Sequence, residues 1–274
     1  MTGIQKGIKI GAICFGVMLI VAIFGALLSL LTLFQKEDRI IPGESYSKDY
    51  SNISSIEIDV VSSNIVIREG SKMNVEIEGA SETIKVHDDH DGNLEIEEEF
   101  AFFKKNTSKR IIITIPNGTM IRELSIDSGA GKIEIESIQV QELSIDQGAG
   151  LLELTDVSSK QTEIDGGAGE IKIKNSVLND LDLDTGVGKV DIQADITGIS
   201  EIDCGVGAVD LTLTGMEETY KIKAYKGIGT ITINDQSYSS DYVYGNGNNI
   251  ISIDGGIGEV KVSIPDSIDP GFSR

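Results

Sequence analysis

The chain has 274 residues, with 31 glycines, no tryptophan and only 5% aromatic residues. Its 44 acidic residues outnumber the 23 Lys and Arg residues, which gives a formal net charge of −21. An acidic surface of this kind repels nucleic acid and anionic lipid headgroups, so we expect no nucleic-acid partner. The scarcity of large rings disfavours a conventional globular core, whereas abundant glycine suits strands joined by tight turns.

The N-terminal region predicts a single transmembrane α-helix over residues 10–35. Residues 10–34 form a run of 25 residues without a charge, and about 20 apolar residues suffice to span a bilayer. A cleaved signal peptide fits less well, because its apolar region is about 7–15 residues long and ends in a small-residue cleavage site. We therefore expect a short cytoplasmic tail at residues 1–9 and a polar juxtamembrane linker at residues 36–50.

The expected location is the cell membrane, with the domain after the helix outside the cell. Lys6 and Lys9 favour a cytoplasmic N-terminus. Residues 1–35 contain these two lysines and no acidic residue, so the rest of the chain carries a net charge of −23. Cys204 has no soluble partner, since Cys14 lies in the predicted helix. An exported domain without disulfides is typical of Gram-positive bacteria, although a reversed topology would place the same domain in the cytoplasm.

Seven copies of one short phrase follow: an apolar pair, usually Asp, then x-Gly-apolar-Gly, and a second apolar alternation. LSIDSGAGKIEI at residues 124–135 and LDLDTGVGKVDI at residues 181–192 are clear examples. The closing glycines are spaced by 19, 19, 19, 19, 22 and 29 residues and are Gly131, Gly150, Gly169, Gly188, Gly207, Gly229 and Gly258. A nearly fixed period of this length is typical of a solenoid.

The alternation within each copy assigns faces to the strands. One aliphatic column comprises Ile133, Leu152, Ile171, Val190, Val209, Ile231 and Val260, and the next comprises Ile135, Leu154, Ile173, Ile192, Leu211, Ile233 and Val262. The residues between the two columns are polar. Stacking successive copies about 4.8 Å apart would bury both columns. Each rung would then contain two short strands and two turns, and the rungs would follow one another in chain order.

The predicted fold is therefore all-β: a β-solenoid (β-helix) of about 19-residue rungs at residues 119–265, preceded by the single N-terminal transmembrane helix. Residues 51–118 form an N-terminal β capping part, in which residues 56–67 read as a copy that has lost its glycines. Residues 266–274 form a C-terminal tail.

The residue between the two glycines of each copy is always apolar. We expect its side chain to point into the interior at a corner of the solenoid. The residues concerned are Ala130, Ala149, Ala168, Val187, Val206, Ile228 and Ile257.

The aspartates before the glycines predict a ladder of stacked carboxylates. They are Asp127, Asp146, Asp165, Asp184 and Asp203, with Asp254 further on. Calcium sites resemble this pattern, but Ca²⁺ needs about 6–8 oxygen ligands and one carboxylate per rung does not supply them. A hydrogen bond from a turn N–H to each carboxylate outweighs the repulsion of about 1 kcal/mol between neighbours. We therefore interpret these residues as acceptors that stabilise turns.

No other group of residues indicates a metal, a cofactor or catalysis. The two histidines, His87 and His90, lie in one polar turn, HDDHDG, and no further Cys or His completes a zinc site. The same scarcity leaves no Ser-His-Asp arrangement, so we expect no enzyme and no catalytic residues.

Two segments interrupt the regular pattern. The longest repeat interval contains Tyr238, Tyr242 and Tyr244 among Ser, Gly and Asn, a composition typical of recognition loops, so these tyrosines are the candidate ligand-binding residues. A hairpin whose tyrosines cover the solenoid is the alternative. The second segment, residues 97–110, contains three phenylalanines and is expected to cap the core.

The predicted anchor and the repeat I-D-x-G-A-G-x-I-x-I resemble the "putative adhesin", β-strand-repeat family of membrane-anchored bacterial envelope proteins. The resemblance covers about residues 50–265 and implies a surface-exposed, membrane-tethered β-solenoid. It supplies no catalytic or ligand residues. The chain departs from the pattern at Tyr225, which replaces the Asp, and in its two longer spacings. These departures argue against a uniform binding ladder.

The expected function is a non-enzymatic, membrane-anchored cell-surface module, adhesin-like or envelope-associated, with an extracellular or envelope partner. One alternative is a polymerising β-helical scaffold at the membrane. The other is a β-helical carbohydrate-active enzyme, an alternative that rests on analogy of fold.

Overall fold

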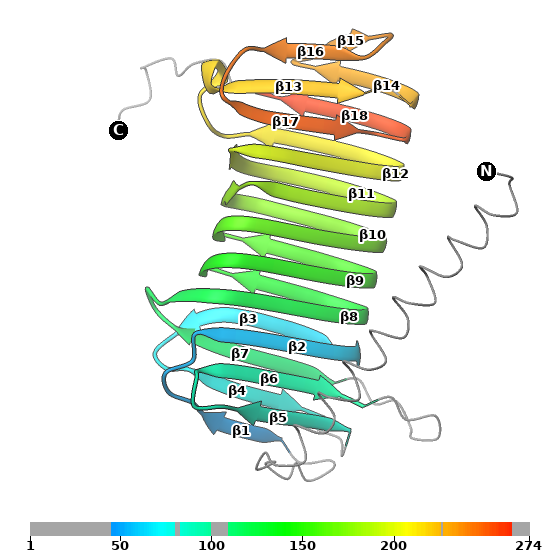
Figure 1. Ribbon diagram of the computed structural model, residues 1–274. Coiled ribbons are helices and arrows are strands. Elements are labelled where there is room, and N and C mark those ends of the chain that lie inside the picture. Colours follow the sequence, from blue (N-terminus) through cyan, green and yellow to red (C-terminus); the bar gives the residue numbers. More distant parts are fainter. Residues whose placement is uncertain (1–44, 80–82, 100–108, 226, 265–274) are drawn as a thin grey trace, which may run out of the picture. The chain divides into compact units, whose positions relative to one another are not determined.

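The structure, a computed structural model, describes residues 45–79, 83–99, 109–225 and 227–264 (Figure 1). All of them belong to one compact unit, Arg39–Arg274. The predicted tail, transmembrane helix and C-terminal tail, most of the linker, and Phe100, Phe102 and Phe103 lie outside the described residues. Within those ranges, no helix has the length and hydropathy that a membrane crossing requires.

The centre of this unit is a stack of five long strands in parallel register (Figure 1). They are β8 (Met120–Glu136), β9 (Gln139–Thr155), β10 (Ser158–Asn179), β11 (Leu181–Thr197) and β12 (Ile199–Leu213). Ile133 pairs with Leu152, which pairs with Ile171, and all three are almost completely buried. The predicted aliphatic columns are thus confirmed, and so is an all-β, solenoid-like fold.

Each of these five central rungs differs from the prediction in having one strand that bends, in place of two strands separated by a turn at the glycines. Pairing between β10 and β11 continues from Gly166 and Thr185 to Ala168 and Val187, so the ladder of hydrogen bonds continues around the glycine corner. The opposite corner uses left-handed backbone at 19-residue intervals. Ser137, Asp156 and Asn175 have φ angles of 57°, 55° and 51° there, and Asn and Asp adopt this conformation more readily than most residues.

The N-terminal part forms three further layers. The rung of β2 (Ser55–Ser62) and β3 (Asn64–Gly70) pairs with β8, so that Ile56 lies opposite Leu124 and Ile65 opposite Ile133. The copy without glycines at residues 56–67 is thus a true rung. On its other side lie β6 (Asn93–Glu98) and β7 (Arg110–Pro116). Three antiparallel strands complete this end: β5 (Ile84–Asp88), β4 (Asn74–Glu78) and β1 (Tyr46–Asp49).

The C-terminal rungs do not follow chain order, and the expectation that they would is wrong. The seventh repeat, β17 (Asn249–Asp254) and β18 (Ile257–Ser263), pairs with β12. The sixth repeat, β13 (Tyr220–Tyr225) and β14 (Ile228–Ile233), lies outside the seventh and pairs with it. A 3-10 turn, Glu217–Thr219, precedes β13. The longest repeat interval therefore lets the chain build the outer rung first and then return.

The return passes through two short antiparallel strands, β15 (Gln236–Tyr238) and β16 (Tyr242–Gly245). Antiparallel strands thus lie outermost at each end of the described unit, and the rungs between them are parallel (Figure 1). Short edge strands of this kind protect a sheet from pairing with other chains.

Candidate functional site

The predicted aspartate ladder exists and is longer than the sequence indicated. Successive members face one another in adjacent strands: Glu97, Asp59, Asp127, Asp146, Asp165, Asp184, Asp203 and Asp254. Because the seventh repeat moves inward, Asp254 lies beside Asp203, and Tyr225 ends the ladder beyond Asp254. We call these eight residues the carboxylate ladder. The sequence did carry a signal for Asp59, which follows two aliphatic residues separated by one residue, as most of the repeat aspartates do.

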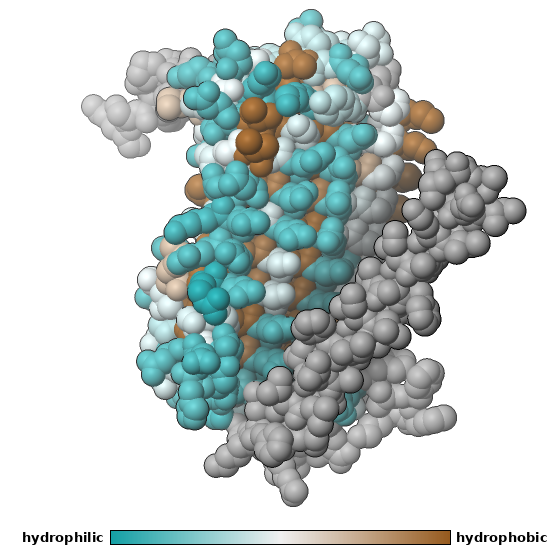
Figure 2. All heavy atoms as spheres, in the orientation of Figure 1, coloured by the Kyte–Doolittle hydropathy of each residue, from teal (hydrophilic) through white to brown (hydrophobic). Residues whose placement is uncertain are grey.

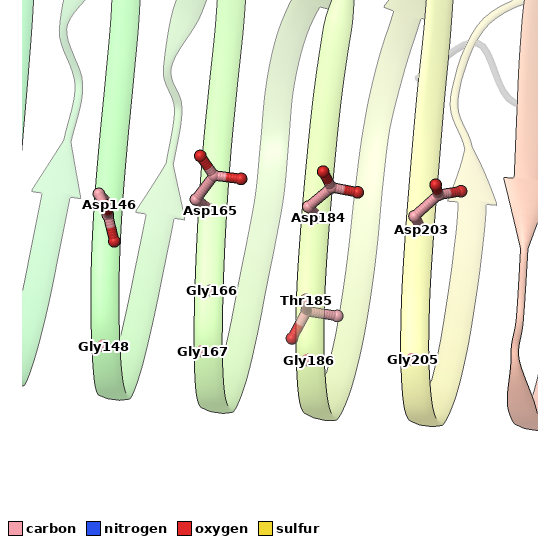
Figure 3. Close-up of a pocket in the computed structure, with 10 residues that line it drawn as sticks. All are labelled: Asp146, Gly148, Asp165, Gly166, Gly167, Asp184, Thr185, Gly186, Asp203 and Gly205. Carbon is pink, nitrogen blue, oxygen red and sulfur yellow. The ribbon is translucent and has the colours of Figure 1, made fainter. Parts of the chain in front are cut away.

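A groove runs along the ladder where the glycines have no side chains. Its volume is about 470 Å³. Four aspartates of the ladder and the glycines beside them form most of its lining: Asp146, Asp165, Asp184, Asp203, Gly148, Gly167, Gly186 and Gly205. Figure 3 shows the carboxylates of Asp165, Asp184 and Asp203 turned in one direction, and that of Asp146 turned towards the glycine corner. Carboxylates and bare backbone are therefore the groups that this groove offers to a partner.

The carboxylates of the ladder are poorly neutralised by the protein. Burial, followed by the charges of Asp184 and Asp146, raises the pKa of Asp165. Burial, followed by Glu201 and Asp184, raises the pKa of Asp203. Within the described residues, no Lys or Arg forms an ion pair with the aspartates of the ladder. The repulsion between neighbours is thus left uncompensated.

The hydrogen bonds expected to stabilise the turns are mostly missing. Asp254 accepts one from the N–H of Gly256 at 3.0 Å. Among the described residues, the other five predicted aspartates accept no comparable bond. The ladder is therefore not explained by turn stabilisation, except at its C-terminal end.

The same rungs have a second face, which carries charges of both signs that pair with one another. We call it the second face, and its residues include Lys132, Glu134, Glu153, Lys189 and Asp191. Lys132 lies 2.8 Å from Glu134 and 2.7 Å from Glu153, and Lys189 lies 3.2 Å from Asp191. The hydrogen bond from Lys132 lowers the pKa of Glu153. The two faces thus differ: the second face neutralises its own carboxylates, and the ladder face does not.

The apolar residues between the glycines point outward, which contradicts the expectation that they line the interior. Val187, Val206, Ile257 and Ile228 are 55%, 44%, 51% and 73% exposed. They face one another in that order on four successive rungs, and we call them the apolar ridge. Figure 2 shows apolar side chains projecting from this edge of the molecule. The alternation of faces restarts at the corner, because glycines such as Gly207, with φ 154°, redirect the backbone.

The three candidate tyrosines lie together in the C-terminal cap. The rings of Tyr238 and Tyr242 stack with their centroids 3.6 Å apart. Tyr244 donates a hydrogen bond to Glu217 and accepts one from Asn234 at 3.3 Å. All three are partly buried and pack against the core. Their position fits the role of covering the last rung, and ligand binding by them stays a prediction.

The two histidines of the HDDHDG turn lie in different environments. His87 is buried on β5, whereas His90 is exposed in the turn that follows. Asp89 organises that turn by accepting hydrogen bonds from the N–H groups of Asp91 and Asn93, both at 2.9 Å. Nowhere in the described ranges do three or more His, Cys, Asp or Glu side chains have an arrangement that could hold a metal ion.

Comparison with known proteins identifies a family. The model of a family described as Toastrack DUF4097 matches residues 53–266, in agreement with the resemblance seen in the repeat. No curated protein matches the chain. A "putative adhesin" from Bacteroides fragilis is 18% identical, covers 81% of this chain and 100% of its own, and has a TM-score of 0.42. A "putative cell adhesion protein" from Clostridium sporogenes is 17% identical, covers 81% and 99%, and has a TM-score of 0.34.

Proposed function

Since the chain belongs to the Toastrack DUF4097 family, we propose that it is a non-enzymatic surface module of the adhesin type, anchored in the bacterial cell membrane by residues 10–35. The solenoid lies outside the cell, of a Gram-positive bacterium, and contacts a partner in the envelope or beyond it. The carboxylate ladder and the adjoining apolar ridge are the contact surface.

The observation that carries this proposal is the contrast between the two faces. Lysines neutralise the second face at distances of 2.7–3.2 Å. The ladder face keeps its carboxylates unpaired, although burial and the repulsion between neighbours raise the pKa values of Asp165 and Asp203. Repulsion within a column of unpaired carboxylates lowers the stability of the fold. A cationic partner that neutralises the column removes this repulsion, which adds to the free energy of binding. The exposed ridge beside the column adds apolar contact area.

The partner of this surface is therefore extended, cationic and partly apolar. Eight carboxylates about 4.8 Å apart span about 34 Å. A fully extended peptide of about 12 residues covers that length. The short antiparallel strands at both ends of the described unit argue against end-to-end assembly. The scaffold alternative therefore has less support than the surface module.

Binding can be tested with the full chain in mild detergent and a fluorescent 12-residue oligolysine as the probe. The ladder variant carries Asp165→Asn, Asp184→Asn and Asp203→Asn. The matched control carries Glu153→Gln, Asp191→Asn and Asp210→Asn, which removes the same charge from the second face. We expect the ladder variant to bind at least about tenfold more weakly, and the control to change by less than about twofold.

Equal losses in the two variants would contradict the proposed surface, because they would mean that the probe responds to the net charge alone. Raising the salt concentration should weaken wild-type binding more steeply than it weakens binding of the ladder variant. The proposed location has its own test, protease treatment of intact cells: cleavage within residues 36–274 supports an outward domain, and complete resistance, with cleavage after lysis, contradicts it.

A further inference from the structure

A second groove lies at the corner of the solenoid opposite the glycines, towards the C-terminal ends of β11, β12 and β18, which lie side by side (Figure 1). Its volume is about 610 Å³. The residues that line it are Gln193, Thr212, Leu213, Thr214, Asn234, Asp235, Ser263 and Ile264. The groove is separate from the carboxylate ladder, because the second-face residues Lys189 and Asp191 lie between Asp184 and Gln193 on β11.

The corner is hollow at this place because β11 and β12 omit a residue that fills it in the earlier rungs. The residues that occupy the corner there, with left-handed backbone, are Ser137, Asp156 and Asn175. The register between β10 and β11 skips Asn175, and β11 passes directly from Gln193 to Ala194. Ala194 pairs with Leu213 of β12, which has no left-handed residue beside it either. The bulge that closes the corner in the earlier rungs is therefore missing here.

The polar side chains around the groove have no partner in the described part of the chain. Gln193 pairs with Thr212, and Thr212 pairs with Ser263, so their side chains form one outward column. Thr214 and Asp235 line the same groove. Among the described residues, none of these five side chains forms a hydrogen bond or an ion pair.

Other polar side chains near this corner are satisfied within the protein. Ser176 donates to the carbonyl oxygen of Lys174 at 2.9 Å and accepts from the N–H of Val157 at 3.2 Å. Asn234 accepts from the N–H of Ile264 at 2.8 Å. The five side chains of the groove therefore differ from their neighbours, because their hydrogen-bonding groups stay open to a ligand.

These open groups define the chemistry of the ligand. The amide of Gln193 and the hydroxyls beside it both donate and accept hydrogen bonds, so a matching ligand must do the same along its length. Asp235 is the single charged residue in the lining, and the net charge of −21 repels anions. Leu213 and Ile264, almost completely buried, supply an apolar floor. A neutral molecule with many hydroxyl groups and apolar C–H faces fits this lining.

We propose that the groove binds an uncharged glycan, with Gln193, Thr212 and Ser263 in contact with its hydroxyl groups. The rungs place these side chains about 4.8 Å apart, so one chain of sugars can contact them in succession. Asp235 accepts hydrogen bonds from hydroxyls at the end of the groove, since a carboxylate has two acceptor oxygens. Ligand sites typically have volumes of about 300–1,000 Å³, a range that includes this groove. The glycan site goes beyond the proposed surface function and does not depend on the carboxylate ladder.

The test is a titration of the full chain with two uncharged tetrasaccharides, the tetramer of N-acetylglucosamine and maltotetraose, in a detergent without sugar headgroups. Methyl NMR signals of Ile, Leu and Val follow the binding. We expect at least one sugar to shift the signals of Leu213 and Ile264 until they saturate, because these residues form the floor of the groove. The signals of Leu152 and Ile171, which do not line it, are the internal control and should not move.

A groove variant and a matched control locate the site. The groove variant carries Gln193→Ala and Thr212→Val, which remove two of the open polar groups and leave the floor intact. We expect it to bind the same sugar about tenfold more weakly. The control is Thr155→Val, because Thr155 lies in the same outward column, opposite Lys174, which lies opposite Gln193. The control should change the affinity by less than about twofold.

Absence of shifts with both sugars, or equal binding by the groove variant and the wild type, would overturn the glycan site. Shifts at Leu152 and Ile171 as large as those at Leu213 and Ile264 would also overturn it. The ladder variant separates this proposal from the surface function: it should bind the sugar as the wild type does. A loss of sugar binding in the ladder variant would contradict the glycan site, because it would place the sugar on the carboxylate ladder.

Discussion

Asp203 of β12 and Asp254 of β17 are direct neighbours in the sheet, although the whole sixth repeat lies between them in the sequence. The sixth repeat has Tyr225 in place of the aspartate, and it is displaced to the outside of the seventh. The rearranged order therefore keeps the column of carboxylates unbroken up to its last member. Chain order would have interrupted that column with the tyrosine.

The glycine corners predict a sharp difference between two substitutions. At Gly207 a methyl group would overlap the carbonyl oxygen of Gly188 in the next rung, so Gly207→Ala should cost about 3 kcal/mol or more. Gly118 has a φ of 72° and open space around it, so Gly118→Ala should cost about 1 kcal/mol. Thermal unfolding compares the two. Similar losses would mean that the rungs do not approach each other as closely as described.

An ion pair inside the N-terminal cap predicts a second large effect. Lys109 forms a buried ion pair with Glu98, and their side chains are only 5% and 4% exposed. Glu98 also accepts hydrogen bonds from the N–H groups of Val61 and Ser62, at 3.1 and 3.3 Å, where β2 meets β3. Lys109→Met strands the carboxylate and should destabilise the protein by about 3–5 kcal/mol.

The control for that substitution is Lys172→Met on the second face. Lys172 lies 2.9 Å from Glu170 in a more exposed pair, and such pairs contribute about 0–1 kcal/mol. Melting temperatures of the two variants should differ by several degrees. If Lys109→Met behaves like its control, the interior pair does not hold the cap together.

The ladder predicts that removal of one carboxylate stabilises the protein. Asp184 contributes to the raised pKa values of both Asp165 and Asp203. Neutralising it in Asp184→Asn removes two repulsive contacts, which should add about 1 kcal/mol at pH 7 and raise the melting temperature by about 2–4 °C. Asp191→Asn removes the same charge from an ion pair at 3.2 Å and should bring no gain.

The gain from Asp184→Asn should also depend on pH in a defined direction. The pKa values of Asp165 and Asp203 are raised above 3.8, so protons bind more tightly to the folded state than to the unfolded state. Acidification towards pH 3.8 therefore relieves the repulsion that these two groups contribute in the wild type, and so reduces the advantage of the variant. A lower melting temperature for Asp184→Asn at pH 7 would instead favour turn stabilisation, the role that the sequence alone suggested.

The period of the sequence was sufficient to predict the register of the rungs and the buried columns. Ile133, Leu152 and Ile171 stack because each repeat places the same aliphatic pair at the same distance from its glycines. The period could not predict the stacking order, because the sixth and seventh repeats carry equivalent strands and either can pair with β12. The observed order depends on the segment between the two repeats, in which β15 pairs with β14 and β16 pairs with β13.

The candidate site was predicted in part. The repeat predicted the stack of aspartates, but the inward orientation expected for Val187 and Val206 is wrong, because glycine backbone redirects the side chain that follows. The Glu98–Lys109 pair had no sequence signal. Glu98 continues the inward alternation of Leu94 and Ile96, a pattern that normally indicates an apolar residue.

Disulfide formation between engineered cysteines tests the register and order of the ladder most directly. Glu201 pairs with Ser252, and Ser252 pairs in turn with Lys223. Adjacent strands place paired Cα atoms about 5 Å apart, within disulfide range, whereas strands two apart exceed it. Oxidation followed by peptide mapping should join the cysteines of Glu201→Cys with Ser252→Cys, and leave those of Glu201→Cys with Lys223→Cys unjoined. The reverse result would show that the repeats stack in chain order and that the carboxylate ladder is broken at Tyr225.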